Sequence, residues 1–204
     1  MSIHEPATLV TDVLLAAVAA FLADRLGTCN GSAQRWFKVA LNLSAVSAVV
    51  GGTYHGFGPN VSTGAAAIWW KATLVSLHLV SAALALSLVF EVSASQRRRI
   101  WIGLIALKFA VFTVITFTKP IFLVAIADYG TSMMAWFVAA CVGRHLWRSA
   151  MFAGIGLSLV AAAVQQFRWA PFHGFNHNDL YHVIQAVAFI ALYRAARKLS
   201  PVPQ

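Results

Sequence analysis

Seven apolar stretches, each long enough to form a membrane-spanning helix, fill almost the whole chain of 204 residues. A helix needs about 20 mainly apolar residues to cross the hydrocarbon core of a bilayer. The breaks between the stretches are short and carry mostly Gly, Pro, Asn or Ser, as connections between neighbouring helices do. The pattern predicts one all-α domain over residues 1–204, a polytopic seven-transmembrane-helix bundle with helices at 8–26, 36–54, 64–91, 99–117, 120–142, 146–164 and 178–194.

Composition and charge agree with a membrane protein. Hydrophobic residues make up 60% of the chain and charged residues 10%, whereas an average soluble domain is about 25% charged. The net charge of +9 forms no basic face or nucleic-acid-binding motif, so we expect no nucleic-acid partner. Cys29 lies in a polar break and Cys141 in an apolar stretch, which indicates no disulfide framework. Residues 1–6 lack the positive charge of a secretory signal, so we expect the first stretch to remain as a helix.

The basic residues are distributed very unevenly over the breaks. The N-terminus and the second, fourth and sixth breaks hold only Lys119 and Arg168. The first, third and fifth breaks, the C-terminal tail and the adjoining helix ends hold eleven: Arg25, Arg35, Lys38, Arg97, Arg98, Arg99, Arg144, Arg148, Arg194, Arg197 and Lys198. Because Lys and Arg accumulate on the cytoplasmic side, we predict an outer N-terminus and an inner C-terminus. We expect a multi-pass protein of the bacterial inner (cytoplasmic) membrane.

Two histidine-bearing segments, residues 51–59 and 173–182, interrupt the apolar pattern. We interpret each as a turn beside the end of a helix. The predicted orientation places both turns at the outer face, so that five titratable groups share one membrane level: His55, His173, His177, Asp179 and His182. Ionisable groups at helix depth are costly and tend to mark function. We therefore expect a single site at the outer ends of the second and seventh helices.

The spacing in this region suits a metal site. Asp179 and His182 are three residues apart and so share one helix face, as in the carboxylate-x-x-His pairs with which bundle proteins hold metals. With His55 they would provide three protein ligands and leave a position for water, as in a catalytic zinc site. His177 would serve as a further ligand or would hydrogen-bond to one.

A structural interpretation of the same residues stays open. Asn176 or Asn178 would be an ordinary helix N-cap, and Asp179 in the first turn would interact favourably with the helix dipole. His55, with the glycines that follow it, would simply end a helix.

His55 and His182, with the continuation over residues 183–189, are similar to two motifs of a known group. The chain resembles the alkaline ceramidase and progestin/adipoQ receptor superfamily of seven-helix membrane proteins, called CREST. The resemblance implies a zinc ion held by three histidines, from Ser-x-x-x-His in helix 2 and His-x-x-x-His in helix 7, with an Asp between helices 2 and 3. The activity it implies is hydrolysis of a lipid amide.

The chain departs from this pattern at three points. Asn178 stands where the first histidine of helix 7 is expected, and Gly51 stands where the serine is expected, although Thr53 offers a nearby hydroxyl. No Asp or Glu occurs between His55 and Glu91. Asp179 or His177 would then replace the missing ligand, or the chain has lost metal and catalysis.

Four charged residues lie inside the apolar stretches: Asp12, Lys71, Lys108 and Asp128. A charge at mid-helix costs about 2.5–3.5 kcal/mol on translocon scales, so unpaired exposure to lipid is unfavourable. Lys108 and Asp128 differ by only about 5 Å in height, a gap that a lysine side chain can span. Asp12 and Lys71 lie nearer the outer face and would line a cavity beneath the histidines. Buried structural pairs or snorkelling lysines are the alternative, and His78 is expected to be a hydrogen-bonded packing residue.

These observations lead to three functional hypotheses. The first is a zinc-dependent membrane hydrolase of a lipid amide or ester, with Asp179 or His177 moving protons and Asn178 and Thr53 near the substrate. The second is a non-catalytic binding or sensor protein whose histidines titrate at the outer face. The third is a small transporter that uses the intramembrane Asp and Lys residues. The expected partners are membrane lipids and a lipid-like substrate or ligand.

Overall fold

The computed structural model describes residues 2–199, and this part of the chain is almost entirely helical. Within it the apolar stretches form seven α-helices, which confirms the predicted all-α class. Their bounds are α1 Pro6–Arg25, α2 Ser32–Phe57, α3 Thr63–Val92, α4 Ser95–Thr118, α5 Phe122–Val142, α6 Arg148–Phe167 and α7 His177–Ala196, with a short 3₁₀ helix η1 Gly58–Asn60 after α2.

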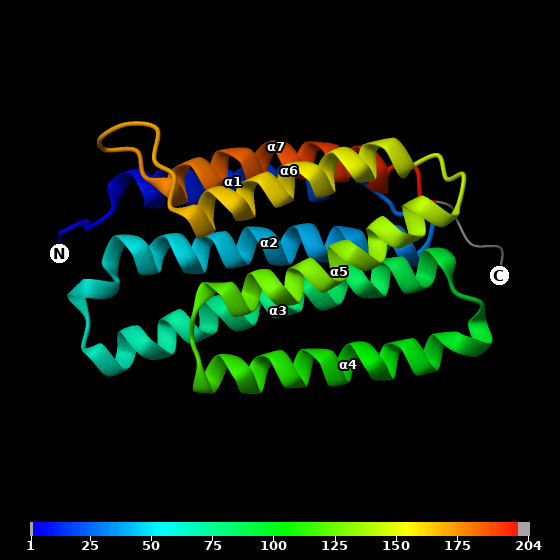
Figure 1. Ribbon diagram of the computed structural model, residues 1–204, viewed down its shortest axis with the longest axis horizontal. Helices are drawn as coiled ribbons and strands as arrows, with labels where there is room; N and C mark the ends of the chain where they lie inside the picture. Colours follow the sequence, from blue (N-terminus) through cyan, green and yellow to red (C-terminus); the bar gives the residue numbers. More distant parts are fainter. Residues whose placement is uncertain (1, 200–204) are drawn as a thin grey trace.

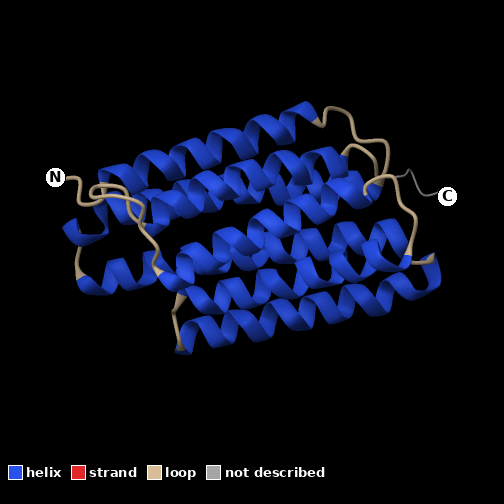
Figure 2. Cartoon of the chain, turned by 45° about the horizontal axis from the view of Figure 1, so that its top comes forward, coloured by secondary structure: helices blue, strands red, loops and turns tan. Residues whose placement is uncertain are grey.

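The helices run along one another, and the described chain starts and finishes at opposite ends of the bundle (Figure 1). The loops gather at these two ends (Figure 2). The most extensive contacts join α2 to α3, α6 to α7 and α1 to α2. Helix α5 packs on both α3 and α6. Helix α4 lies at the edge, where it packs against α3 and more sparsely against α5.

Five of the helices in the described part, α1, α3, α4, α5 and α6, are long and apolar enough to cross a membrane. Several helices could therefore cross a membrane, which is consistent with a multi-pass membrane protein. Helices α2 and α7 carry more polar side chains, several of which are buried inside the bundle, such as Ser47 in α2 and Gln185 in α7. These two helices add polar groups to an interior that also receives them from α1, α3 and α5.

The predicted turn at residues 51–59 is wrong for its first part. Helix α2 continues to Phe57, so Gly51, Gly52 and His55 are helical, and the chain leaves the helix only at η1. The glycine pair permits close packing: a Cβ at Gly52 would lie 2.5 Å from the Cβ of Asp12. Small residues let neighbouring helices approach in this way. The predicted turn at residues 173–182 is confirmed only up to Asn176, with a positive φ of 83° at Gly174, because α7 begins at His177.

An aromatic core closes the bundle at the end that carries the basic loops. Trp136 and Trp147 meet edge to face with ring centroids 5.2 Å apart, and Phe37 lies 6.2 Å from Trp136. Both indoles are buried and donate hydrogen bonds, Trp136 to the Leu84 carbonyl and Trp147 to Glu91. Buried tryptophans with satisfied N–H groups give dense packing here. The opposite half of the bundle is less filled and contains a cavity.

Candidate functional site

The cavity has a volume of about 330 Å³, and residues from every helix except α4 line it. Along α2 its lining extends from His55 to Ser44, eleven residues or about 16 Å of helix. Its lining residues at one end, including Trp70 and Tyr181, are partly exposed, whereas deeper ones such as Phe189 are buried. The cavity thus runs inward from one end of the bundle.

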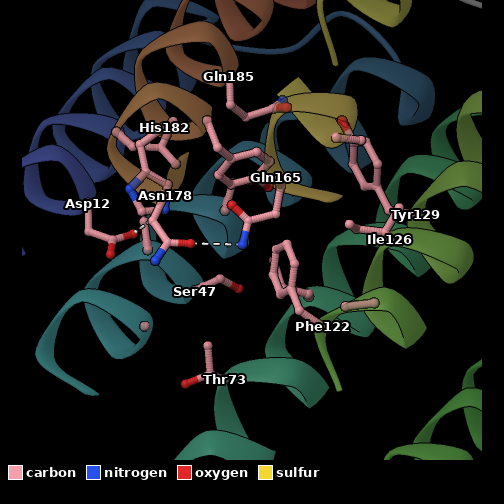
Figure 3. Close-up of a pocket in the computed structure, with 18 of the residues that line it drawn as sticks. Asp12, Ser47, Thr73, Phe122, Ile126, Tyr129, Gln165, Asn178, His182 and Gln185 are labelled. Carbon is pink, nitrogen blue, oxygen red and sulfur yellow. Dashed lines mark hydrogen bonds and ion pairs between the residues drawn. The ribbon is translucent and has the colours of Figure 1, made fainter. Parts of the chain in front are cut away.

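A hydrogen-bonded group from α1 and α7 lies on one wall of the cavity (Figure 3). His182 Nε2 lies 3.2 Å from Asp12 Oδ1, and its Nδ1 lies 3.1 Å from the Thr11 hydroxyl. A neutral imidazole with its proton on Nε2 satisfies both contacts, because Nδ1 then accepts from Thr11. Asp12 is only 3% exposed. Its second oxygen, Oδ2, is buried and has no hydrogen-bond partner among the described residues.

Asp179 has a structural role at the start of α7. Its Oδ2 accepts from the Asn176 backbone N–H at 2.7 Å, while the Asn176 side chain accepts from the N–H groups of Asn178 and Asp179. This reciprocal pair is a capping box. It confirms Asn176 as the N-cap, one of the structural alternatives predicted from the sequence. Asp179 is fully buried, and its Oδ1 lies 3.5 Å from the Thr11 hydroxyl, behind the cavity wall.

His55, His177 and Asn178 all line the cavity near the end where its lining is partly exposed. His55 Nδ1 contacts Glu5 Oε2 at 3.3 Å, and its ring lies beside Trp70. Asn178 Oδ1 accepts from Gln165 Nε2 at 2.8 Å (Figure 3). Of the predicted cluster, His55, His177 and His182 line one cavity. Asp179 is buried behind its wall, and His173 is exposed in the α6–α7 loop.

The side chains predicted to bind zinc are not arranged around a common point at which a metal ion could bind. Within residues 2–199, no group of three or more His, Cys, Asp or Glu side chains is arranged to hold a metal ion. His182 uses both ring nitrogens with Asp12 and Thr11, and Asp179 is engaged in the capping box. The residues as they lie do not fit the zinc centre, which stays a prediction.

Four of the predicted cavity residues do not line the cavity. The Thr53 hydroxyl donates to the Val49 carbonyl of its own helix. The Lys71 ammonium lies over the Phe117 ring, 5.5 Å from its centroid. Lys108 and Asp128 instead form an ion pair 2.8 Å long, which confirms the pairing predicted from their similar heights in the bilayer.

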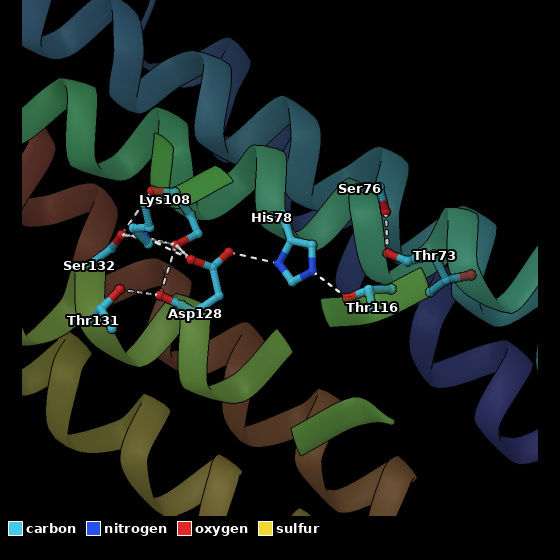
Figure 4. Close-up of polar contacts among 9 residues, drawn as sticks. Thr73, Ser76, His78, Lys108, Thr116, Asp128, Thr131 and Ser132 are labelled. Carbon is cyan, nitrogen blue, oxygen red and sulfur yellow. Dashed lines mark hydrogen bonds and ion pairs between the residues drawn. The ribbon is translucent and has the colours of Figure 1, made fainter. Parts of the chain in front are cut away.

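This ion pair belongs to a buried network that joins α3, α4 and α5 (Figure 4). His78 Nδ1 donates to Asp128 Oδ2 at 2.7 Å, and His78 Nε2 contacts the Thr116 hydroxyl at 2.8 Å. Lys108 also donates to the hydroxyls of Ser81 and Ser132. The network attaches the edge helix α4 to the bundle. His78 is thus a hydrogen-bonded packing residue, as predicted.

Sequence reasoning missed Thr11, Glu5 and Gln165. Thr8, Thr11 and Asp12 lie three and four residues apart and therefore form a polar stripe along one face of α1. In an apolar helix, such a polar stripe indicates the face that points into the bundle. Glu5 and Gln165 lie near helix ends, where polar residues are ordinary, so no signal distinguished them.

A protein-family model matches the chain over residues 7–201, and its description is a family of unknown function, DUF6962. No curated protein gives a match, and no solved structure does.

Proposed function

The chain belongs to the DUF6962 family, and we propose that it is a membrane protein that binds an amphiphilic molecule in the cavity. The observation that carries this proposal is the cavity itself, which combines a largely apolar lining with a buried carboxylate at Asp12. Binding sites for small molecules are typically concave and apolar, with a few fixed polar groups that orient the ligand. The apolar part of the ligand would lie beside residues such as Leu77 and Phe189, and its polar group beside Asp12.

We place all seven helices across the membrane, with the N-terminus outside and the C-terminus inside. The eleven basic residues support this orientation, because their positions at helix ends and in loops all fall at the end closed by the aromatic core. The cavity would then open toward the outer leaflet, since its partly exposed residues lie at the other end. Trp70 and Tyr181 at this end suit the interfacial position of aromatic side chains.

Binding without catalysis agrees best with the contacts. The side chains that would hold zinc are used in other contacts, so zinc-dependent hydrolysis is the weaker proposal. Transport through Lys108 and Asp128 is weaker too, because these residues pair with each other away from the cavity lining.

Native mass spectrometry of the protein in a non-ionic detergent tests the proposal. The probes are three molecules with the same twelve-carbon chain: dodecylamine, 1-dodecanol and dodecanoate. We expect at least one of them to form a saturable one-to-one adduct, and we expect Ala162→Phe to abolish it, because Ala162 lines the cavity. Ala163→Phe is the matched control, since the neighbouring Ala163 is exposed. An adduct that both variants retain equally would overturn the proposal, as would the absence of any adduct in the unmodified protein.

A further inference from the structure

Two acidic side chains, Asp12 and Asp179, lie at one wall of the cavity. Asp12 lines the cavity directly, and the carboxylate of Asp179 lies behind it, within 3.5 Å of the Thr11 hydroxyl. No Lys or Arg is present among the described residues that line the cavity. The basic groups in this described lining are three imidazoles, of which His182 already contacts Asp12. A ligand with an anionic group would therefore meet two acidic side chains and no Lys or Arg of the described lining.

Asp12 has a hydrogen-bonding position that the protein does not fill. Its Oδ1 faces His182 Nε2, whereas its buried Oδ2 has no partner among the described residues. A buried carboxylate oxygen that is left unpaired is costly. A donor that carries positive charge satisfies such an oxygen better than a neutral donor does, because charge-assisted hydrogen bonds are about twice as strong.

A second acceptor lies in the same cavity. Gln165 donates through Nε2 to Asn178, which fixes the orientation of its amide, and its Oε1 is buried without a partner in the described part of the chain. Gln165 comes from α6 and Asp12 from α1, so the two acceptors belong to different walls. A primary ammonium group has three N–H donors and no acceptor, and can therefore interact with both of these side chains.

Aromatic rings complete the surroundings of this site. Trp70, Phe122 and Tyr181 all line the cavity; the centroids of Trp70 and Phe122 lie 6.4 Å apart, and those of Phe122 and Tyr181 lie 5.8 Å apart. The faces of such rings attract cations within about 6 Å. They repel anions for the same reason. The aromatic rings and the acidic side chains of the cavity wall therefore both favour a positive head group.

From these contacts we infer that the ligand is an organic ammonium ion with an apolar tail. The inference rests on the proposed function of the cavity and names the chemical class that the cavity takes. Its ammonium group lies beside the side chains of Asp12 and Gln165, and its tail extends toward Phe189 and Val80. A cavity of about 330 Å³ holds roughly eleven water-sized groups of about 30 Å³ each. A chain or ring system of about a dozen heavy atoms therefore fills it.

The three twelve-carbon probes differ only in the head group and so test this inference. In the unmodified protein we expect dodecylammonium to bind at least about tenfold more tightly than 1-dodecanol, and dodecanoate to bind most weakly. Asp12→Asn should remove this preference while 1-dodecanol affinity changes less than about threefold. Asp24→Asn, an exposed position on the same helix, should leave all three affinities unchanged. Gln165→Leu provides a second test, with an expected loss of about threefold or more for the amine alone.

The outcomes separate the two proposals. Equal affinity for the amine and the alcohol, or a preference for the carboxylate, would overturn the ammonium inference and leave the cavity as an amphiphile site. A preference for the amine that survives both Asp12→Asn and Gln165→Leu would also overturn it. No adduct with any probe would overturn the proposed function itself. If Asp12→Asn unfolds, as judged by circular dichroism, the Gln165→Leu result decides the question.

Discussion

Replacement of Asp128 by asparagine tests whether the network of α3, α4 and α5 holds the edge helix in place. Asp128 is 1% exposed and receives three contacts, from His78 at 2.7 Å, Lys108 at 2.8 Å and Ser81 at 3.2 Å. The substitution keeps the size of the side chain and removes its charge. The Lys108 ammonium would retain only its two serine hydroxyl partners.

The expected loss follows from the burial of the pair. Removal of one partner of a buried ion pair costs roughly 3–5 kcal/mol. The Lys108 side chain is 22% exposed, so part of its charge remains solvated and the lower end of this range, about 3 kcal/mol, is expected. Native proteins are stable by only about 5–15 kcal/mol, and the variant should therefore unfold at a visibly lower temperature or detergent concentration.

Equilibrium unfolding in mixed micelles, followed by circular dichroism, measures this change in free energy. The double variant Asp128→Asn/Lys108→Met removes both charges, and we expect it to recover at least about half of the loss. Asp24→Asn, at an exposed position, should change stability by less than about 0.5 kcal/mol. A cost below about 1 kcal/mol for Asp128→Asn would refute the reasoning. So would a double variant whose loss of unfolding free energy equals the sum of the losses of Asp128→Asn and Lys108→Met alone.

Three further predictions concern helix packing, topology and capping. Gly52→Ala should separate α1 from α2 and weaken amphiphile binding, because its Cβ would lie 2.5 Å from α1; Gly103→Ala, which meets open space, should leave binding unchanged. Cys29, in the α1–α2 loop, should react with a membrane-impermeant maleimide in inside-out vesicles and not in intact cells, in a Cys141→Ala background; the reverse pattern would show the opposite orientation. Asn176→Ala should cost about 1 kcal/mol in unfolding experiments through loss of the N-cap of α7, and an unchanged stability would contradict the capping role.

The helices were predictable because each needs only local information. Long apolar stretches bounded by polar breaks gave their number and type, and the bounds agree with the structure to within a few residues for most of them. Helix α2 differs most, since it begins at Ser32 and continues to Phe57, beyond the predicted 36–54 and through most of the predicted turn at 51–59, including Gly51 and Gly52. Glycine permits a break but does not require one, and here the pair serves the contact with α1.

The sequence could predict at which level along the helices the site residues lie, but not which helices lie side by side. Charge topology placed His55 and His182 at one level, and both do line one cavity. The partner of His182 is Asp12 on α1, which no spacing within α7 could indicate. Lys108 shows the same limit: its height suggested Asp128 as a partner, and the position of α5 beside α3 and α4 allows this pair to form.

Asp179 forms a capping contact within its own helix end and not a metal site shared with other helices. Its spacing to His182 suited a metal pair, and its spacing to Asn176 suited a capping box. The backbone N–H groups at the start of α7 need acceptors wherever the helix lies, so the capping contact forms within the chain itself. A metal site would require further ligands from other helices at the correct distances.

Photo-crosslinking tests the central claim, that the cavity is a ligand site, most directly. The probe is dodecylamine with a diazirine near the end of its chain, added to the protein in nanodiscs, with the labelled residues located by peptide mass spectrometry. We expect saturable labelling of deep lining residues such as Ser47, Leu77 and Phe189, and its loss when unlabelled dodecylamine competes. Labelling confined to exposed positions of α4, such as Leu107, would contradict the claim.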